Sequence, residues 1–170
     1  MNLNQKHFIV GVLTMGLLGS LFGFSKKDNS PKFAKLTQTD AAQLEKQRAV
    51  ISAEAKRRYG TLGLTKTKED LVVLQRLLDD RAFAKTQTYD LQCLGVVLGD
   101  VFVSELPLKW VMVTDEYGTD PTLRFKNTTI QINALTMISK RAEKDEAVDV
   151  SQLLDITRQQ LTKLEKEGWH

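Results

Sequence analysis

The sequence is poor in the residues on which many enzymes and disulfide-rich domains depend. Its one cysteine is Cys93, so no disulfide can form within the chain. Its two histidines are His7 and His170, close to the two ends. A Ser-His-Asp or Cys-His catalytic site needs an interior histidine as its base, and a zinc site needs Cys or His ligands. We therefore expect neither of these sites, and no metal or cofactor is predicted.

The sequence also lacks a large excess of positive or negative charge. The net charge is +3, which is too small to predict a nucleic-acid partner. Hydrophobic residues make up 42% and charged residues 26% of the 170 residues, values typical of a globular protein. A chain of this length forms one domain unless its composition indicates otherwise.

One long hydrophobic run is present near the N-terminus. Residues 8–24 carry no charge, and Lys6 precedes them. A basic start followed by an apolar run is typical of a bacterial signal sequence, but the best cleavage site, at Gly23-Phe24-Ser25, is poor. As a helix the run would span about 25 Å, slightly less than a hydrocarbon core of roughly 30 Å. We expect residues 1–25 to be a signal sequence or a membrane anchor, with membrane contact through residues 8–24.

The side of the membrane stays open. Four lysines follow the apolar run, and the positive-inside tendency would then place the domain in the cytoplasm. The signal-like start instead favours export to the periplasm. Either arrangement predicts a protein of the cell envelope.

After a polar linker over residues 26–39, residues 40–170 predict one α+β domain. Three helices come first. The first is capped by Asp40 with Gln43 and ends at Gly60, and the second opens at Thr67 with Asp70. The third runs from about Asp90 to Pro107. The third is apolar on almost all sides, which is typical of a helix at the centre of a fold. Gly95 and Gly99 would weaken it, so we expect them to allow a close crossing. Cys93 should be buried and inert.

The second half of the domain predicts strands and then helices. Residues 110–114, 123–125 and 129–133 read as a three-stranded antiparallel meander. Two C-terminal helices follow, one near residues 134–144 and one capped by Asp149 with Gln152. Helices, strands and helices in this order indicate the α+β class.

The densest polar cluster is acidic. It consists of Asp115, Glu116 and Asp120 around Gly118, with Arg124 further along the chain. Carboxylates on a hairpin could bind a divalent cation or act as an acid/base pair, although the spacing does not match the EF-hand calcium loop. The same residues are also those that a turn prefers, and Arg124 could pair with an acid across the strands. These four residues are the weak catalytic candidates of the sequence.

Four segments carry a resemblance to a known family. They are Leu94-Gly-Val-Val-Leu-Gly99-Asp-Val, Trp110-Val-Met-Val, Asp115-Glu-Tyr-Gly-Thr-Asp120-Pro and Leu135-Thr-Met-Ile-Ser-Lys-Arg141. Over about residues 70–155 the chain resembles the bacterial domain of unknown function 3806 family. That resemblance supports the domain boundary and implies no activity, since the family has none assigned.

Three hypotheses about function follow. The first is a non-enzymatic binding or accessory module at the membrane or in the envelope, with a protein partner. The second is a carboxylate-dependent hydrolase that uses Asp115, Glu116 and Asp120. The third is an immunity-type inhibitor protein.

Overall fold

The computed structural model describes residues 30–60 and 63–168. The apolar run over residues 8–24 and both histidines lie outside the described residues. The elements in chain order are β1 (Lys32–Ala34), α1 (Gln38–Tyr59), α2 (Asp70–Asp79), α3 (Thr88–Glu105), β2 (Leu108–Asp115), β3 (Gly118–Phe125), β4 (Gln131–Ile132), α4 (Leu135–Ala142) and α5 (Val150–Lys166). The predicted α+β class is confirmed.

The start of α1 lies slightly earlier than the sequence predicted. Thr37 caps the helix: its side chain accepts a hydrogen bond from the backbone N–H of Asp40 at 3.2 Å, and the Asp40 carboxylate accepts one from the N–H of Thr37 at 2.8 Å. This reciprocal pair is a capping box, in which Asp40 is the third helical residue rather than the cap. Gly60 ends the helix in the left-handed conformation, as predicted.

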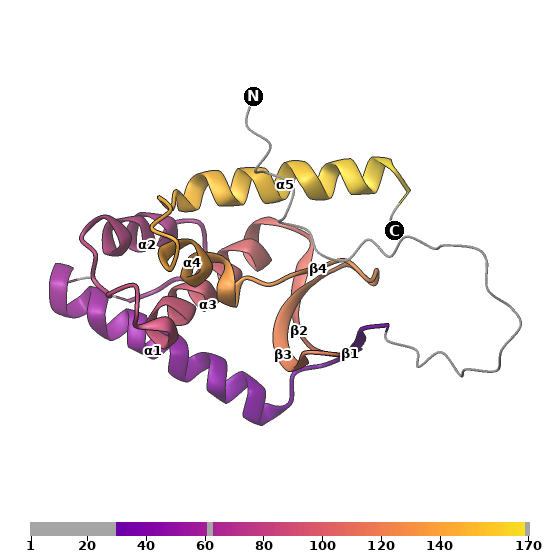
Figure 1. The fold of residues 1–170 in the computed structure, drawn as a ribbon, viewed down its shortest axis with the longest axis horizontal. Coiled ribbons are helices and arrows are strands. Elements are labelled where there is room, and N and C mark those ends of the chain that lie inside the picture. The colour runs from indigo at the N-terminus through magenta and orange to yellow at the C-terminus, as the bar shows by residue number, and fades with distance from the viewer. Residues whose placement is uncertain (1–29, 61–62, 169–170) are drawn as a thin grey trace, which may run out of the picture.

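Helix α3 forms the centre of the domain. It packs against α1, α2, α4 and β2, and its residues from Cys93 to Phe102 are all buried. A Cβ at Gly95 would lie 2.4 Å from the carbonyl oxygen of Leu135, at the start of α4. This contact confirms that a glycine in α3 allows a close crossing. Figure 1 shows α3 behind α4, with α1 running along the lower side of the helical layer.

The sheet has four antiparallel strands in the order β1-β2-β3-β4, so the predicted count of three is corrected. The added strand, β1, lies in the stretch expected to be a polar linker and pairs with the end of β2, with Phe33 opposite Val113. Strands β2 and β3 form a long hairpin from the pair Leu108–Phe125 to the pair Asp115–Gly118. Leu108, Leu123 and Phe125 belong to the hydrophobic core beneath it.

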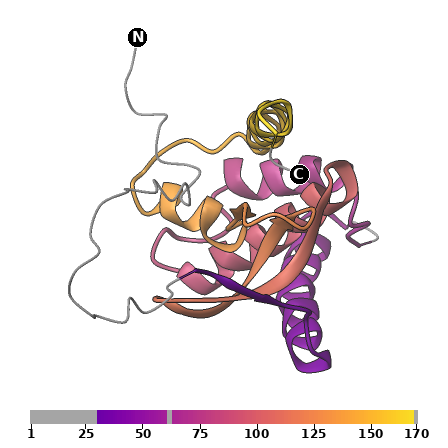
Figure 2. The ribbon, with the colours of Figure 1, turned by 90° about the vertical axis from the view of Figure 1, so that its right-hand side faces the viewer.

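Helix α5 closes the domain at its C-terminal end. Asp149 caps it, accepting a hydrogen bond from the N–H of Gln152 at 2.9 Å, as predicted. Leu153, Leu154 and Leu161 turn into the core, and Figure 2 shows the helix end-on above the other elements. Among the described residues, the structure contains no helix with the length and hydrophobicity needed to span a membrane.

Candidate functional site

The acidic residues singled out from the sequence lie at the tip of the β2–β3 hairpin. Asp115 ends β2, and its carboxylate accepts a hydrogen bond from the backbone N–H of Tyr117 at 2.8 Å. Glu116 and Asp120 are exposed, and the Tyr117 side chain is 86% exposed. Asp115 and Asp120 lie on the same face of the hairpin. The tip is therefore a solvated turn in which one carboxylate stabilises the backbone.

Arg124 lies at the other end of the hairpin, near the root of β3. Its guanidinium donates hydrogen bonds to the backbone carbonyls of Thr128 at 2.6 Å and Asn127 at 2.7 Å. The same group stacks over the ring of Phe33, 4.4 Å from its centroid. The structure thus places Arg124 as a tie between β1, β3 and the following loop, away from the three carboxylates.

One further residue considered for chemistry, Cys93, can be placed. Cys93 is buried in α3, and its burial raises the pKa of the thiol to about 11, so the reactive thiolate is disfavoured. Over residues 30–60 and 63–168, no three His, Cys, Asp or Glu side chains come together in a way that could hold a metal ion.

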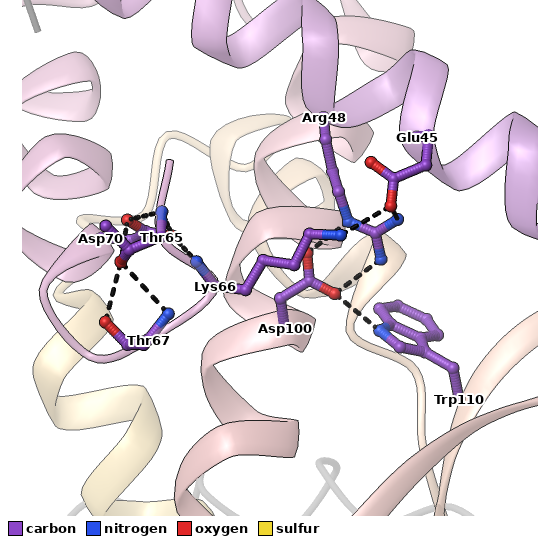
Figure 3. Close-up of polar contacts among 8 residues, drawn as sticks. All are labelled: Glu45, Arg48, Thr65, Lys66, Thr67, Asp70, Asp100 and Trp110. Carbon is purple, nitrogen blue, oxygen red and sulfur yellow. Dashed lines mark hydrogen bonds and ion pairs between the residues drawn. The ribbon is translucent and has the colours of Figure 1, made fainter. Parts of the chain in front are cut away.

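A buried polar network lies where α1, α3 and β2 meet (Figure 3). Asp100 of α3 is 6% exposed, and its carboxylate binds the guanidinium of Arg48 through two hydrogen bonds, one of them at 2.6 Å. The indole N–H of Trp110 donates to the same carboxylate at 2.9 Å. Burial lowers the pKa of Arg48, but the hydrogen bonds and charges of Asp100 and Glu45 together outweigh this effect, and the net shift of the pKa is upward. The carboxylate is therefore fully paired.

Gly99 makes room for this network. A Cβ at position 99 would lie 2.3 Å from a carbon of the Trp110 ring. The indole therefore rests directly on the α3 backbone beside Asp100. This second close approach explains why α3 carries two glycines one turn apart.

The network continues outward to the loop before α2. Glu45 accepts from Arg48 at 3.0 Å and from the ammonium group of Lys66 at 2.6 Å. The buried carboxylate of Asp70 accepts from the backbone N–H groups of Thr65 and Lys66, each at 2.8 Å. The loop is thus tied to α2 through Asp70 and to α1 through Lys66 (Figure 3).

The sequence reasoning missed this network. Asp100 was an available signal, because it is a single acid within a stretch of α3 that is otherwise apolar. Its partner Arg48 was not predictable from spacing, since it lies 52 residues earlier in the chain. The structure shows a stabilising cluster with no unpaired acid or base.

A groove opens at the opposite end of the helical layer. It has a volume of about 890 Å³ and lies between the end of α2, the loop over residues 80–87, the start of α3 and the loop over residues 142–148. Leu77, Leu91 and Leu94 form its apolar floor, and Phe83 lies beside them. Charged side chains line its rim: Asp79, Arg81, Lys85, Asp145 and Glu146.

Both walls of the groove are held by hydrogen bonds. Gln75 of α2 donates to the carbonyl of Val148 at 3.1 Å and accepts from the N–H of Val150 at 3.0 Å, which fixes the loop before α5. On the other wall, the hydroxyl of Tyr59 donates to Asp80 at 2.7 Å. Lys85 and Asp145 form an ion pair of 2.8 Å that joins the two walls. The groove is therefore a preformed feature with one exposed polar contact across it.

Comparisons with known proteins bear on the fold and the family. Residues 70–153 match the model of a family described as Domain of unknown function (DUF3806). A crystal structure of a protein from Bacteroides thetaiotaomicron VPI-5482 shares the fold, with a TM-score of 0.66 and 11% sequence identity; the match covers 74% of this chain and 46% of that one.

The chain thus spans less than half the length of that solved protein. A comparison with curated proteins found no match. The matched residues include Asp100, Trp110 and the whole lining of the groove. Residues 70–153 of the chain resemble the DUF3806 family.

Proposed function

We propose that this protein is a non-enzymatic binding or accessory module of the membrane or cell envelope, and that the groove is its binding site. The groove itself carries the proposal. Ligand sites are typically concave, lined mainly by apolar side chains with a few polar groups, and enclose roughly 300–1,000 Å³. The groove between α2, α3 and the loop before α5 has a volume in this range, about 890 Å³, and an apolar floor, with charged side chains along its rim.

The pairing of the charged side chains supports binding rather than catalysis. Asp70 and Asp100 are the two buried carboxylates of the described residues, and each is occupied by hydrogen bonds from neighbouring groups. The acidic residues of the hairpin are exposed to solvent on a turn. General acid–base catalysis needs a side chain whose pKa is tuned by its surroundings, and no observation at the hairpin favours that role.

The envelope assignment rests on the apolar run over residues 8–24, which lies outside the described residues. It is tested by fractionating cells and treating spheroplasts with a protease. We expect the full-length protein to sediment with membranes. Recovery of the intact chain in the soluble fraction of the cytoplasm would exclude this part of the proposal.

Site-specific photo-crosslinking in living cells tests the groove. The photoreactive amino acid p-benzoylphenylalanine is placed at Ala84, an exposed residue of the groove wall, or at Val72, which is 73% exposed on α2 outside the groove. We expect a discrete adduct from position 84 and none from position 72. Ala147→Trp, which fills the groove from an exposed position of the other wall, should abolish the adduct.

Unchanged thermal unfolding of the Ala147→Trp variant would show that it still folds. The proposal fails if positions 84 and 72 give the same adducts, or if Ala147→Trp leaves the adduct at position 84 intact. A third variant changes Asp115, Glu116 and Asp120 to their amides. If it removes the phenotype that depends on this protein in cells but leaves the adduct at position 84 unchanged, the result would favour the hydrolase.

A further inference from the structure

From the charges on the two walls of the groove we infer its ligand class: a short peptide with apolar side chains and with both its amino and carboxyl termini free. This inference rests on the proposal that the groove is the binding site. It goes further, because it states which chemical groups the walls recognise.

The two walls carry opposite charge. The wall formed by residues 80–87 contributes the cations Arg81 and Lys85, and the wall formed by residues 142–148 contributes the anions Asp145 and Glu146. Two acids lie beside the positive wall. Asp79, on the rim at the end of α2, accepts a hydrogen bond from the side-chain amide of Gln75 at 2.8 Å. Asp80, which does not line the groove, accepts one from the hydroxyl of Tyr59 at 2.7 Å. The groove therefore presents a positive and a negative side across an apolar floor.

The ion pair between Lys85 and Asp145 marks the contact that a ligand would replace. Its two side chains are 54% and 73% exposed. A pair so accessible to water contributes little to stability, so separating it costs little. A ligand that brings its own carboxylate to Lys85 and its own ammonium group to Asp145 restores both charge contacts. A zwitterion meets this requirement, whereas a purely anionic or cationic ligand leaves one wall unpaired.

The floor selects the rest of the ligand. Leu77, Leu91 and Leu94 present apolar side chains between the walls, so the ligand's own side chains should be apolar. The volume of about 890 Å³ is that of a pocket for a drug-sized molecule, which corresponds to a tripeptide or tetrapeptide rather than one amino acid. The backbone groups of Ala82 and Ala84 on this wall are already hydrogen-bonded. Only the backbone N–H and C=O of Phe83, between them, make no hydrogen bond within the described part of the chain, so they can pair with one peptide group of a ligand.

Calorimetric titration of the full-length protein in detergent micelles tests this assignment. The probes are the tripeptide Leu-Ala-Leu, its N-acetyl form, its C-terminal amide and the doubly capped form. We expect the free tripeptide to bind at least tenfold more tightly than either singly capped form. Gly-Gly-Gly should not bind, because it offers nothing to the floor.

Two variants assign each terminus to its wall. Lys85→Ala should weaken binding of the free tripeptide at least tenfold and leave binding of the amide unchanged. Asp145→Asn should weaken the free tripeptide and leave the N-acetyl form unchanged. Lys126→Ala, which removes the exposed ion pair between Lys126 and Glu165 away from the groove, is the matched control and should alter none of the affinities.

Equal binding of the free and doubly capped peptides would overturn the recognition of free termini, and so would an absence of binding by all four. Neither result bears on the crosslink at Ala84, which tests whether the groove is a binding site at all. The two proposals can thus fail separately.

Discussion

The indole of Trp110 lies against the backbone of Gly99, so close that a Cβ at position 99 would be 2.3 Å from the ring. Gly99→Ala should therefore destabilise the protein by about 1–3 kcal/mol, the usual cost of overpacking a core. Gly95→Ala should cost more, because its obstacle is the Leu135 carbonyl, and backbone cannot rotate away as a side chain can. Urea unfolding of the two variants measures both effects.

A double variant tests the cause. Trp110→Phe removes the larger ring, so Gly99→Ala should cost less in that background than in the wild type. If the losses in the free energy of unfolding are strictly additive, the contact between residues 99 and 110 is not the cause of the destabilisation by Gly99→Ala.

The Arg48–Asp100 pair should be far more sensitive to the loss of one partner than to the loss of both. Arg48→Met leaves a buried carboxylate without its cation and should cost about 3–5 kcal/mol in the free energy of unfolding. The double variant Arg48→Met/Asp100→Leu should recover much of that loss, because no buried charge remains. Chemical denaturation of the single and double variants gives both values.

An exposed ion pair provides the control for that comparison. Lys126→Met removes the partner of Glu165 on the surface, and the expected loss is at most about 1 kcal/mol. If Arg48→Met lowers the free energy of unfolding by no more than Lys126→Met does, the buried network does not stabilise the fold more than a surface ion pair.

Cys93 should react with thiol reagents only when the protein unfolds. Burial raises its pKa to about 11 from 9.0, so at pH 8 the native thiol is both protonated and inaccessible. Labelling with a chromogenic disulfide should be negligible in the native protein and complete in denaturant. A Cys93→Ser/Val72→Cys variant, whose thiol is exposed, should react within the mixing time.

Glu54 should contribute to the loss of stability in acid. Hydrogen bonds from Arg57 and Arg58 lower its pKa from 4.5 to about 2. A carboxylate with a lowered native pKa stabilises the fold above its unfolded pKa, and this contribution disappears as the pH falls from about 4.5 to 2. Glu54→Gln should therefore reduce stability at pH 7 by about 0.5–1 kcal/mol, and the effect should disappear as the pH falls below the native pKa of about 2.

Thermal unfolding of the wild type and Glu54→Gln at several pH values measures this difference. Glu45→Gln is a poor control, because Glu45 joins the buried network through Arg48. Asp155→Asn, which removes a more exposed ion pair with Arg158, serves better as a control for the loss of one ion pair on the surface.

Local signals in the sequence predicted the end of α1 and the start of α5, but the expected opening of α2 at Thr67 was wrong, since that helix begins at Asp70 without a side-chain cap. Asp149 caps α5 and Gly60 ends α1 because capping depends on residues within a few positions of each other. The cap of α1 was misplaced by three residues, since Thr37 with Asp40 and Asp40 with Gln43 have the same spacing. Side-chain geometry, which spacing does not contain, decides between them.

Features that depend on distant contacts were not predicted. Strand β1 has three residues and no periodicity of its own, so it is defined by its pairing with residues 112–114 of β2. The groove is formed by loops about 60 residues apart, which Lys85 and Asp145 join. Neither relationship leaves a local pattern, because both arise when the core brings separate segments together.

Strand β1 also gives the domain a mechanically weak attachment at its N-terminal side. Tension along the chain before Lys32 would load a ladder of three residue pairs, supported by the stack of Phe33 on Arg124. Beyond it lies α1, which is held by the capping box at Thr37 and by the buried Arg48–Asp100 pair. If residues 32–37 detach from the sheet, the free chain before α1 becomes longer by about 20 Å, at roughly 3.3–3.6 Å per residue. The core and the groove would stay folded. Under such tension β1 would be a short extensible section at the N-terminal side of the domain.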